Sequence, residues 1–181
     1  MREREEFMQA TITPSAGLKA AGTAGDPRAG KYLIFQLGSE EFGTNVLKVR
    51  EIMKIQDITT VPQTPEFVKG VINLRGQVIP VMDLRTKFGM PEQEQTDRTC
   101  IVVVRTKLAE NELPVGIVVD GVVEVLTLAP TDIEDTPDFG HGVATPYLLG
   151  MAKIKGRVKI LLDMDQALCQ QELQSLNALI Q

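Results

Sequence analysis

Few residues of this chain have the types and spacing that catalysis requires. The single histidine, His141, lies between two glycines, and no second histidine or neighbouring cysteine could complete a zinc site with it. Asp83 and Asp163 could act as a pair of carboxylates, but each directly follows an apolar, strand-like run, which favours helix capping instead. No phosphate-binding loop, nucleophile elbow or dinucleotide fingerprint occurs. We therefore expect a binding protein without enzymatic activity, bound metal or other cofactor.

One charged residue, Arg75, stands apart from its surroundings. It lies in the turn formed by residues 73–76, where Gly76 supplies a positive φ but nothing requires an arginine. Its neighbours Leu74 and Gly76 provide no acid to pair with it. Arg75 therefore serves a partner contact or an ion pair between two lobes, or it is only a solvated turn charge. We expect a geometric role, through a hydrogen-bonded fork to a carboxylate or to carbonyl groups.

The turn belongs to residues 64–84, whose alternating apolar pattern predicts a β-hairpin, and residues 145–164 repeat that pattern. Equivalent positions in the two copies share one constant offset: Gly70 with Gly150, Arg75 with Lys155, Gly76 with Gly156, and Asp83 with Asp163. A second block precedes each copy, because residues 43–52 align without gaps with residues 116–125, which places Glu51 opposite Glu124. The repeat predicts two β lobes of one design.

Composition limits the kinds of protein that this chain can be. Of its 181 residues, 43% are hydrophobic but only 4% are aromatic, so the core must consist mainly of Val, Ile and Leu. The net charge of −5 argues against nucleic acid as the main partner, because phosphate binding needs a basic face. No apolar run approaches the roughly 20 residues of a membrane span. We expect a soluble, cytoplasmic protein in which Cys100 and Cys169 are reduced thiols.

The chain divides into four parts by composition and pattern. Residues 1–29 are rich in glycine, alanine and polar residues and are expected to be a disordered tail. One lobe is expected over about residues 30–95, completed by C-terminal elements, and the other over about residues 98–163. Residues 163–181 are expected to form one helix, which continues to Ile180. Its buried face should consist of Leu168, Leu173, Leu176 and Leu179.

Local signals place the elements within each lobe. A short helical turn should end near Leu47 and a strand should begin at Val49. Asp120-Gly121 predicts a tight hairpin between the strands on either side of it. Each lobe then has about five short strands, which suits a small closed or partly closed barrel, whereas the strand-to-helix alternation of a Rossmann-type sheet is absent.

Three aliphatic residues of the first lobe, Val46, Val49 and Ile52, could line a groove that faces the second lobe. For any one of them taken alone, an ordinary core position is favoured. If Val49 lines a groove, Val49→Asp should weaken partner binding and leave the fold intact, because the new carboxylate must be desolvated on binding. If Val49 belongs to the core, the same change should unfold the protein.

Three blocks of this sequence resemble the CheW-like domain family of chemotaxis coupling proteins: YLIFQLGSEEFGTNVLKVREI, TPEFVKGVINLRGQVIPVMDLRTKFG and VGIVVDGVVEVLTL. The resemblance covers about residues 31–175, and without a kinase segment or receiver domain the chain is most similar to the stand-alone members. It implies two five-stranded, SH3-like barrels. It also implies a non-enzymatic adaptor between the cytoplasmic tip of chemoreceptors and the regulatory domain of the histidine kinase CheA. A scaffold of a non-flagellar chemosensory array, for pili or development, is the alternative that the sequence leaves open.

The resemblance also implies which positions contact partners. Receptor binding would involve a helix held in an aliphatic groove by Val46, Val49, Glu51, Arg75, Cys100, Val115 and Gly116. Phe139 would contact the kinase, in a loop that is made unusually acidic by Glu134 and Asp135. No contact with nucleic acid and no direct membrane insertion are expected.

Overall fold

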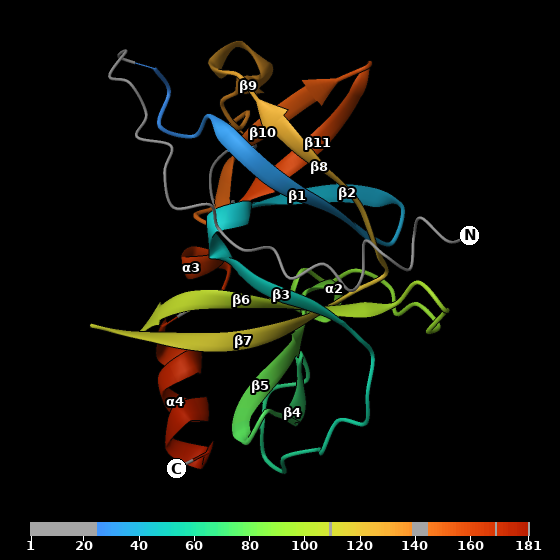
Figure 1. Ribbon diagram of the computed structural model, residues 1–181, viewed down its shortest axis with the longest axis vertical. Helices are drawn as coiled ribbons and strands as arrows, with labels where there is room; N and C mark the ends of the chain where they lie inside the picture. The colour runs from blue at the N-terminus through green and yellow to red at the C-terminus, as the bar shows by residue number, and fades with distance from the viewer. Residues whose placement is uncertain (1–24, 109, 139–144, 169, 181) are drawn as a thin grey trace.

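Two β-sheets build this protein, one above the other along its long axis, as Figure 1 shows. The computed structural model describes residues 25–108, 110–138, 145–168 and 170–180. The expected disorder of residues 1–24 lies outside the described residues, as do Phe139, His141 and Cys169. The mainly β fold predicted from the sequence is confirmed.

The first sheet has six strands in the order β8-β1-β2-β11-β10-β9. Its strands are β1 (Gly30–Leu37), β2 (Glu40–Asn45), β8 (Gly121–Leu128), β9 (Ile133–Glu134), β10 (Leu148–Ile154) and β11 (Arg157–Leu162). The second sheet has the order β3-β6-β7-β5-β4. Its strands are β3 (Val49–Lys54), β4 (Val68–Leu74), β5 (Gln77–Asp83), β6 (Cys100–Leu108) and β7 (Asn111–Val119). The helical segments are η1 (Val46–Lys48), α2 (Leu84–Lys87), η2 (Pro130–Asp132), α3 (Met164–Ala167) and α4 (Gln170–Ile180).

The two halves of the chain exchange hairpins between the sheets. The β1–β2 hairpin lies between β8 and β11, which come from the second half of the chain. In the same way, the β6–β7 hairpin lies between β3 and β5, which come from the first half. The expected division into consecutive lobes, at about residues 30–95 and 98–163, therefore needs correction. Each sheet draws strands from both segments, because β2 and β7 find parallel partners in the other half of the chain.

The Asp120-Gly121 step is not the hairpin turn that its sequence predicts. Strands β7 and β8 lie in different sheets and do not pair with each other, so Asp120 marks the point where the chain crosses from one sheet to the other. The N–H of Asp120 donates to the carbonyl oxygen of Gln36, and its Oδ2 accepts a hydrogen bond of 2.6 Å from the N–H of Gly38. Asp120 is therefore held by the β1–β2 hairpin instead of closing a turn of its own.

The internal repeat is confirmed in the backbone of the two long hairpins. Gly70 pairs with Val81 and Gly150 with Leu161, and in both hairpins the register shifts directly before the glycine. The residues at the two tips, Arg75 and Lys155, both have φ of 51°. Asp83 and Asp163 then cap α2 and α3 with their side chains, as the sequence predicts. The two copies thus share turn, bulge and cap.

Glycine is required where each sheet curls back on itself. Thr59 forms a backbone bridge with Val71, and β9 pairs with β10 in the same way, so the chain that follows β3 or β8 returns to the opposite edge of its sheet. A Cβ at Gly70, which has φ of 141°, would lie 2.1 Å from the carbonyl oxygen of Thr59. No side chain can occupy that space. Close backbone approach at this position therefore allows the barrel to close.

Aromatic side chains link the first sheet to the helix that follows the second. Phe35 and Phe42 stack with ring centroids 6.3 Å apart, Phe42 and Phe88 at 6.1 Å, and Phe88 and Tyr147 at 4.9 Å. Phe88 is the C-cap of α2, which directly follows β5 of the second sheet. The separations are typical of favourable offset stacking. The row therefore helps to hold the two sheets together within one shared core.

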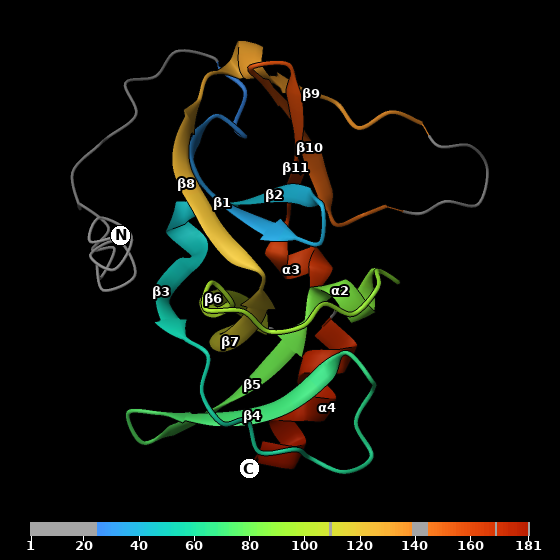
Figure 2. The same ribbon diagram turned by 90° about the vertical axis from the view of Figure 1, so that its right-hand side faces the viewer.

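The C-terminal segment forms two helices instead of the single helix expected. Helix α3 ends at Ala167 because Leu168 leaves the helical region, with φ of −106° and ψ of 84°. Helix α4 then lies beside the second sheet, as Figure 2 shows. Leu168 and Leu173 are fully buried, as predicted, whereas the side chains of Leu176 and Leu179 lie outside those described. Among the described residues, no helix is long and apolar enough to cross a membrane.

We predict that Gly70→Ala destabilises the protein by about 3 kcal/mol or more, because it adds both backbone strain and a clash with Thr59. Gly76→Ala is the matched control. Gly76 also has a positive φ, but a Cβ there would meet nothing within 4 Å, so the cost should be about 1 kcal/mol. Urea unfolding of the two variants measures the difference. Equal losses would show that the close approach at Gly70 is unimportant.

Candidate partner-binding surface

The β4–β5 turn presents Arg75 to solvent in a fixed direction. The Asn73 side chain accepts a hydrogen bond of 2.8 Å from the N–H of Gly76, which holds the turn together. Arg75 itself adopts the left-handed conformation that non-glycine residues adopt infrequently. Its side chain is 73% exposed. The turn therefore points a cation outward instead of folding it onto the sheet.

Arg75 is paired with an acid that is distant in sequence. Its Nη1 donates a hydrogen bond of 2.9 Å to Oε2 of Glu51, whose side chain is only 13% exposed. Glu51 lies on β3, at the far end of the strand order from β4, so the pair spans the two edges of the second sheet. Arg75 does form an ion pair, but within one sheet and not between the two lobes as expected. It is also a single hydrogen bond and not the expected fork.

Most of the aliphatic residues expected to line a groove belong to the core. Val49 is only 5% exposed and packs with Cys100 and Val115 in the largest buried cluster. Ile52 is buried as well, whereas Val46 on η1 is half-buried at the margin of that cluster. Val49, Cys100 and Val115 therefore support the surface from beneath, and their side chains do not form an open groove.

Gly116 is also buried, and its lack of a side chain is structural. A Cβ there would lie 2.9 Å from Cγ2 of Ile101 and 3.3 Å from Cγ2 of Val81, at the parallel pairing of β7 with β5. Nearby, burial raises the pKa of the Cys100 thiol to about 11. A thiol of this kind stays protonated at neutral pH and is a poor nucleophile. Both positions therefore serve the packing of the second sheet.

Two exposed apolar side chains adjoin the Glu51–Arg75 pair in sequence. Leu47 on η1, directly before β3, is 73% exposed, and Val78 on β5, directly after the turn, is 45% exposed. Neither was recognised from the sequence, although an apolar residue beside a polar turn is a usable signal. We name the exposed residues Leu47, Arg75 and Val78, together with the mostly buried Glu51, the β3 face. This set combines two exposed apolar side chains with an ion pair whose cation is open to solvent.

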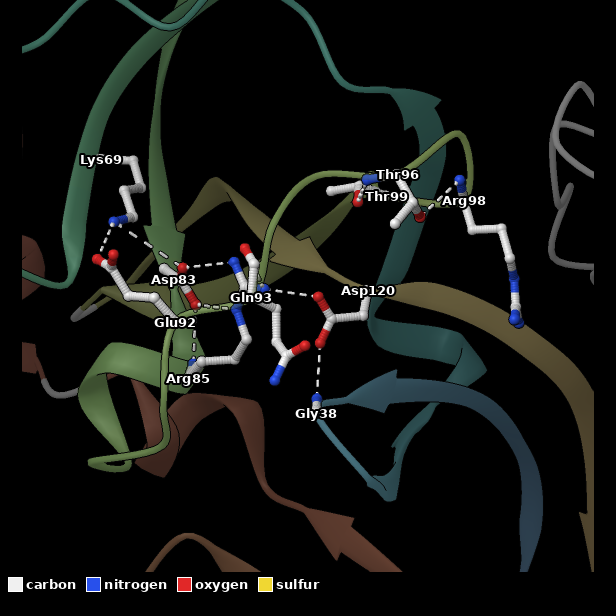
Figure 3. A network of polar contacts seen from close by, with 10 residues as sticks. All are labelled: Gly38, Lys69, Asp83, Arg85, Glu92, Gln93, Thr96, Arg98, Thr99 and Asp120. Atoms are coloured by element: carbon white, nitrogen blue, oxygen red, sulfur yellow. Dashed lines mark hydrogen bonds and ion pairs between the residues drawn. The ribbon is translucent and has the colours of Figure 1, made fainter.

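A buried ionic cluster, the Arg85 clamp, links the two sheets. Figure 3 shows Arg85 between Asp83 and Asp120. The guanidinium donates hydrogen bonds to both oxygens of Asp83, at 3.1 and 2.9 Å, and one of 2.6 Å to Oδ1 of Asp120. Hydrogen bonding to Asp83 raises the pKa of Arg85 above its ordinary value. Because Asp120 also binds Gly38 of the first sheet, Arg85 joins both sheets through one carboxylate.

A second clamp occupies the equivalent place in the repeat with its charges inverted. Asp165 follows the cap of α3 as Arg85 follows the cap of α2, and Asp165 pairs with Lys48 at 2.6 Å. Its other oxygen accepts a hydrogen bond from the N–H of Lys107, as Asp120 accepts one from Gly38. The helix thus carries the cation in one clamp and the anion in the other. Sequence reasoning missed both clamps, because their partners lie far apart along the chain.

The described surface has shallow hollows but no catalytic or metal-binding arrangement. Cavities of about 350 and 210 Å³ lie on either side of Gln93, over the Arg85 clamp. Their linings mix acids, bases and amides whose main contacts are with one another. Among the described residues, no group of His, Cys, Asp or Glu could hold a metal ion.

These features define a class of two-sheet β protein. In the described residues, ionic clusters link the sheets, and exposed apolar and charged side chains remain at the surface as candidates for partner contacts. The sequence profile of the CheW-like domain matches residues 31–172, which is most of the chain. The chain belongs to the CheW-like domain family, as the sequence resemblance predicted.

Known relatives agree with this assignment. The chain is 39% identical over 150 residues to the chemotaxis protein CheW of Klebsiella aerogenes, covering 83% of this chain and 88% of that one. It is 37% identical over 144 residues to CheW of Rhizobium meliloti, covering 79% and 90%. The crystal structure of the scaffolding protein TtCheW from Thermoanaerobacter tengcongensis superposes with a TM-score of 0.70 at 31% identity, covering 82% of this chain and 93% of that one.

We predict that Val49→Asp destabilises the protein by about 3 kcal/mol or more, because it buries a carboxylate without a partner. Leu47→Asp, at an exposed position two residues earlier, should change stability by less than about 0.5 kcal/mol. Thermal unfolding followed by circular dichroism compares them. A Val49→Asp protein that melts like the wild type would place Val49 at an accessible surface.

We also predict that Arg85→Ala costs about 3–5 kcal/mol of stability, because it leaves Asp83 and Asp120 without their buried counter-ion. Lys48→Ala removes the cation of the more exposed clamp and should cost about 1 kcal/mol. Denaturant unfolding measures both. If Lys48→Ala proved the more damaging change, the Arg85 clamp would not be the main link between the sheets.

Proposed function

We propose that this protein is a non-enzymatic adaptor that couples chemoreceptors to the histidine kinase CheA, within arrays at the inner face of the membrane. Membership of the CheW-like domain family and relatives described as chemotaxis and scaffolding proteins support an adaptor role in chemotaxis. The resemblance supplies the receptor and the kinase as the two partners. The observation that carries the proposal is the exposed guanidinium of Arg75, paired with Glu51, together with the exposed apolar side chains of Leu47 and Val78 close to them in sequence.

The β3 face offers the contacts that an amphipathic receptor helix needs. Leu47 and Val78 expose apolar surface that such a helix would bury. Arg75 donates one hydrogen bond to Glu51, and a guanidinium has five N–H donors in a planar fork. The remaining donors can bind a carboxylate or the terminal carbonyl groups of a helix. We therefore assign receptor binding to this face, with the half-buried Val46 at its margin.

The buried members of the expected receptor site act through position. Val49, Cys100, Val115 and Gly116 pack under β3 and between the strands that support it. In this proposal these buried residues fix the position of β3 within its sheet, and Glu51 and Arg75 make the contact with the receptor. Phe139 is proposed as a kinase contact on the strength of the resemblance alone.

The Glu51–Arg75 pair also suggests how receptor binding is transmitted. Arg75 is 73% exposed and within reach of a partner carboxylate, whereas Glu51 is only 13% exposed, so replacing Glu51 leaves a mostly buried carboxylate without its counter-ion. Release of Glu51 would loosen the link between β3 and the β4–β5 turn, which lie at opposite edges of the second sheet. Receptor binding and the internal geometry of the sheet would then be coupled.

We predict that Arg75→Ala reduces receptor-dependent activation of CheA by about tenfold or more, with a smaller loss for Arg75→Lys, which keeps the charge without the planar fork. Both variants should bind the kinase and keep their stability within about 1 kcal/mol, because the side chain is largely exposed. Lys54→Ala, an exposed cation at the end of β3, is the control and should couple normally.

The measurement is kinase activity in arrays reconstituted from this protein, a receptor fragment and CheA, with pull-downs against each partner. Full coupling by Arg75→Ala would reduce Arg75 to a solvated turn charge. Unfolding of the variant would make its role structural.

A further inference from the structure

The tip of the β10–β11 hairpin gathers positive charge on an acidic protein. Lys153, Lys155 and Arg157 are all exposed there, and Val158 beside them is 51% exposed. Within the part of the chain that the structure describes, no ion pair joins any of these three cations to an acid. The chain as a whole carries a net charge of −5. We name residues 153–158 the basic tip.

The equivalent tip of the other hairpin shows how this fold can neutralise such a charge. Arg75 and Lys155 share the same φ of 51°, and Arg75 is paired with Glu51. Glu124 is the residue equivalent to Glu51, but it is exposed, and among the described residues no ion pair joins it to Lys155. One tip is therefore neutralised internally, and the other is left open.

The sequences of the two tips differ in the same sense. The positions of Lys153 and Arg157 are occupied by the neutral Asn73 and Gln77 in the first hairpin, at the same constant offset. The backbone therefore does not require a cation at either place. The exposed valine is kept in both, as Val78 and Val158. Both tips therefore expose a valine, and the second tip differs by the two added cations Lys153 and Arg157.

Acids close to the basic tip are occupied elsewhere or lie to one side. The carboxylate of Asp132 accepts a hydrogen bond from the N–H of Ala129, and Asp135 pairs with Arg28. Glu134, on β9, pairs with Met151 on β10, which lies at the stem of the hairpin and not at its tip. The described neighbours therefore do not neutralise the three cations.

The stem of the hairpin anchors the basic tip to the first sheet. Ala152 is buried, and the buried ammonium of Lys159 pairs with Glu41 of the adjacent strand β2. Figure 1 shows the hairpin projecting from the end of the molecule opposite α4. The buried stem therefore fixes where the hairpin leaves the sheet, and the exposed side chains of the basic tip extend from it.

We propose that the basic tip is a docking surface for an acidic protein segment, with carboxylates that pair with the three cations and an apolar side chain that packs on Val158. We infer an acidic partner because its carboxylates would complement the three cations of the tip. Three basic residues fall short of the cluster of about four to eight that marks recognition of anionic lipid. One half-exposed valine is also too small an apolar surface to anchor a protein in a membrane.

The test uses the full chain and a fluorescent synthetic peptide in which glutamate alternates with valine, with binding followed by fluorescence anisotropy. The double variant Lys153→Gln/Arg157→Gln should bind the peptide at least about tenfold more weakly, and wild-type binding should weaken as salt is added. The control variant Lys31→Gln/Lys54→Gln removes the same charge from two other exposed positions and should bind like the wild type. Circular dichroism should show all three proteins folded.

Three results would overturn the proposal. The first is a peptide that fails to bind the wild type at low salt. The second is an equal loss of binding in the control variant, which would reduce the effect to net charge. The third is binding of the protein to phosphatidylglycerol vesicles, and not to the peptide, that depends on Lys153 and Arg157. That result would assign the basic tip to a lipid surface. Since the peptide assay contains neither receptor nor kinase, its outcome is independent of the proposed coupling role.

Discussion

The parallel pairing of β2 with β11, and of β5 with β7, is the contact on which the rest of the structure depends. Each pairing seats a hairpin from one half of the chain inside the sheet of the other half. Gly43 and Gly116 lie at these pairings, where a Cβ would collide with a neighbouring side chain in both cases. The shared core, the aromatic row and both ionic clamps follow from this exchange, because each of them joins segments that the exchange brings together.

The features that were predictable from the sequence are those that local chemistry decides. Turn glycines and aspartate caps depend on residues within a few positions of one another, and the repeat is visible because both copies keep the same local pattern. The Asp120-Gly121 step was predicted wrongly, because the choice between a hairpin and a crossing depends on a strand, β1, that lies far away in sequence. Burial of Val49 and pairing of Arg85 depend on distant partners in the same way. Leu168 breaks a helix that its apolar periodicity alone would continue.

The repeat separates what the backbone requires from what the side chains can vary. Turns, bulges and caps are the same in both copies, since they set the shape of each barrel. The clamps keep their position and invert their charge, so each can close only with its own partner segment. The hairpin tips differ most, because they lie at the surface and are free of the core. A fold of this kind can alter what it binds without altering how it is held together.

The hairpin exchange also determines when this protein can fold during its synthesis. Among the described strands, those of the β1–β2 hairpin are synthesised before all others, yet its neighbours β8 and β11 come from the second half of the sequence and are made later. Until then both of its edges carry unpaired backbone groups, and Leu33 and Phe35 have no core to enter. Contacts of such high sequence separation make folding slow and largely post-translational. The edges and apolar side chains of this hairpin are therefore covered only after the second half of the chain has been made.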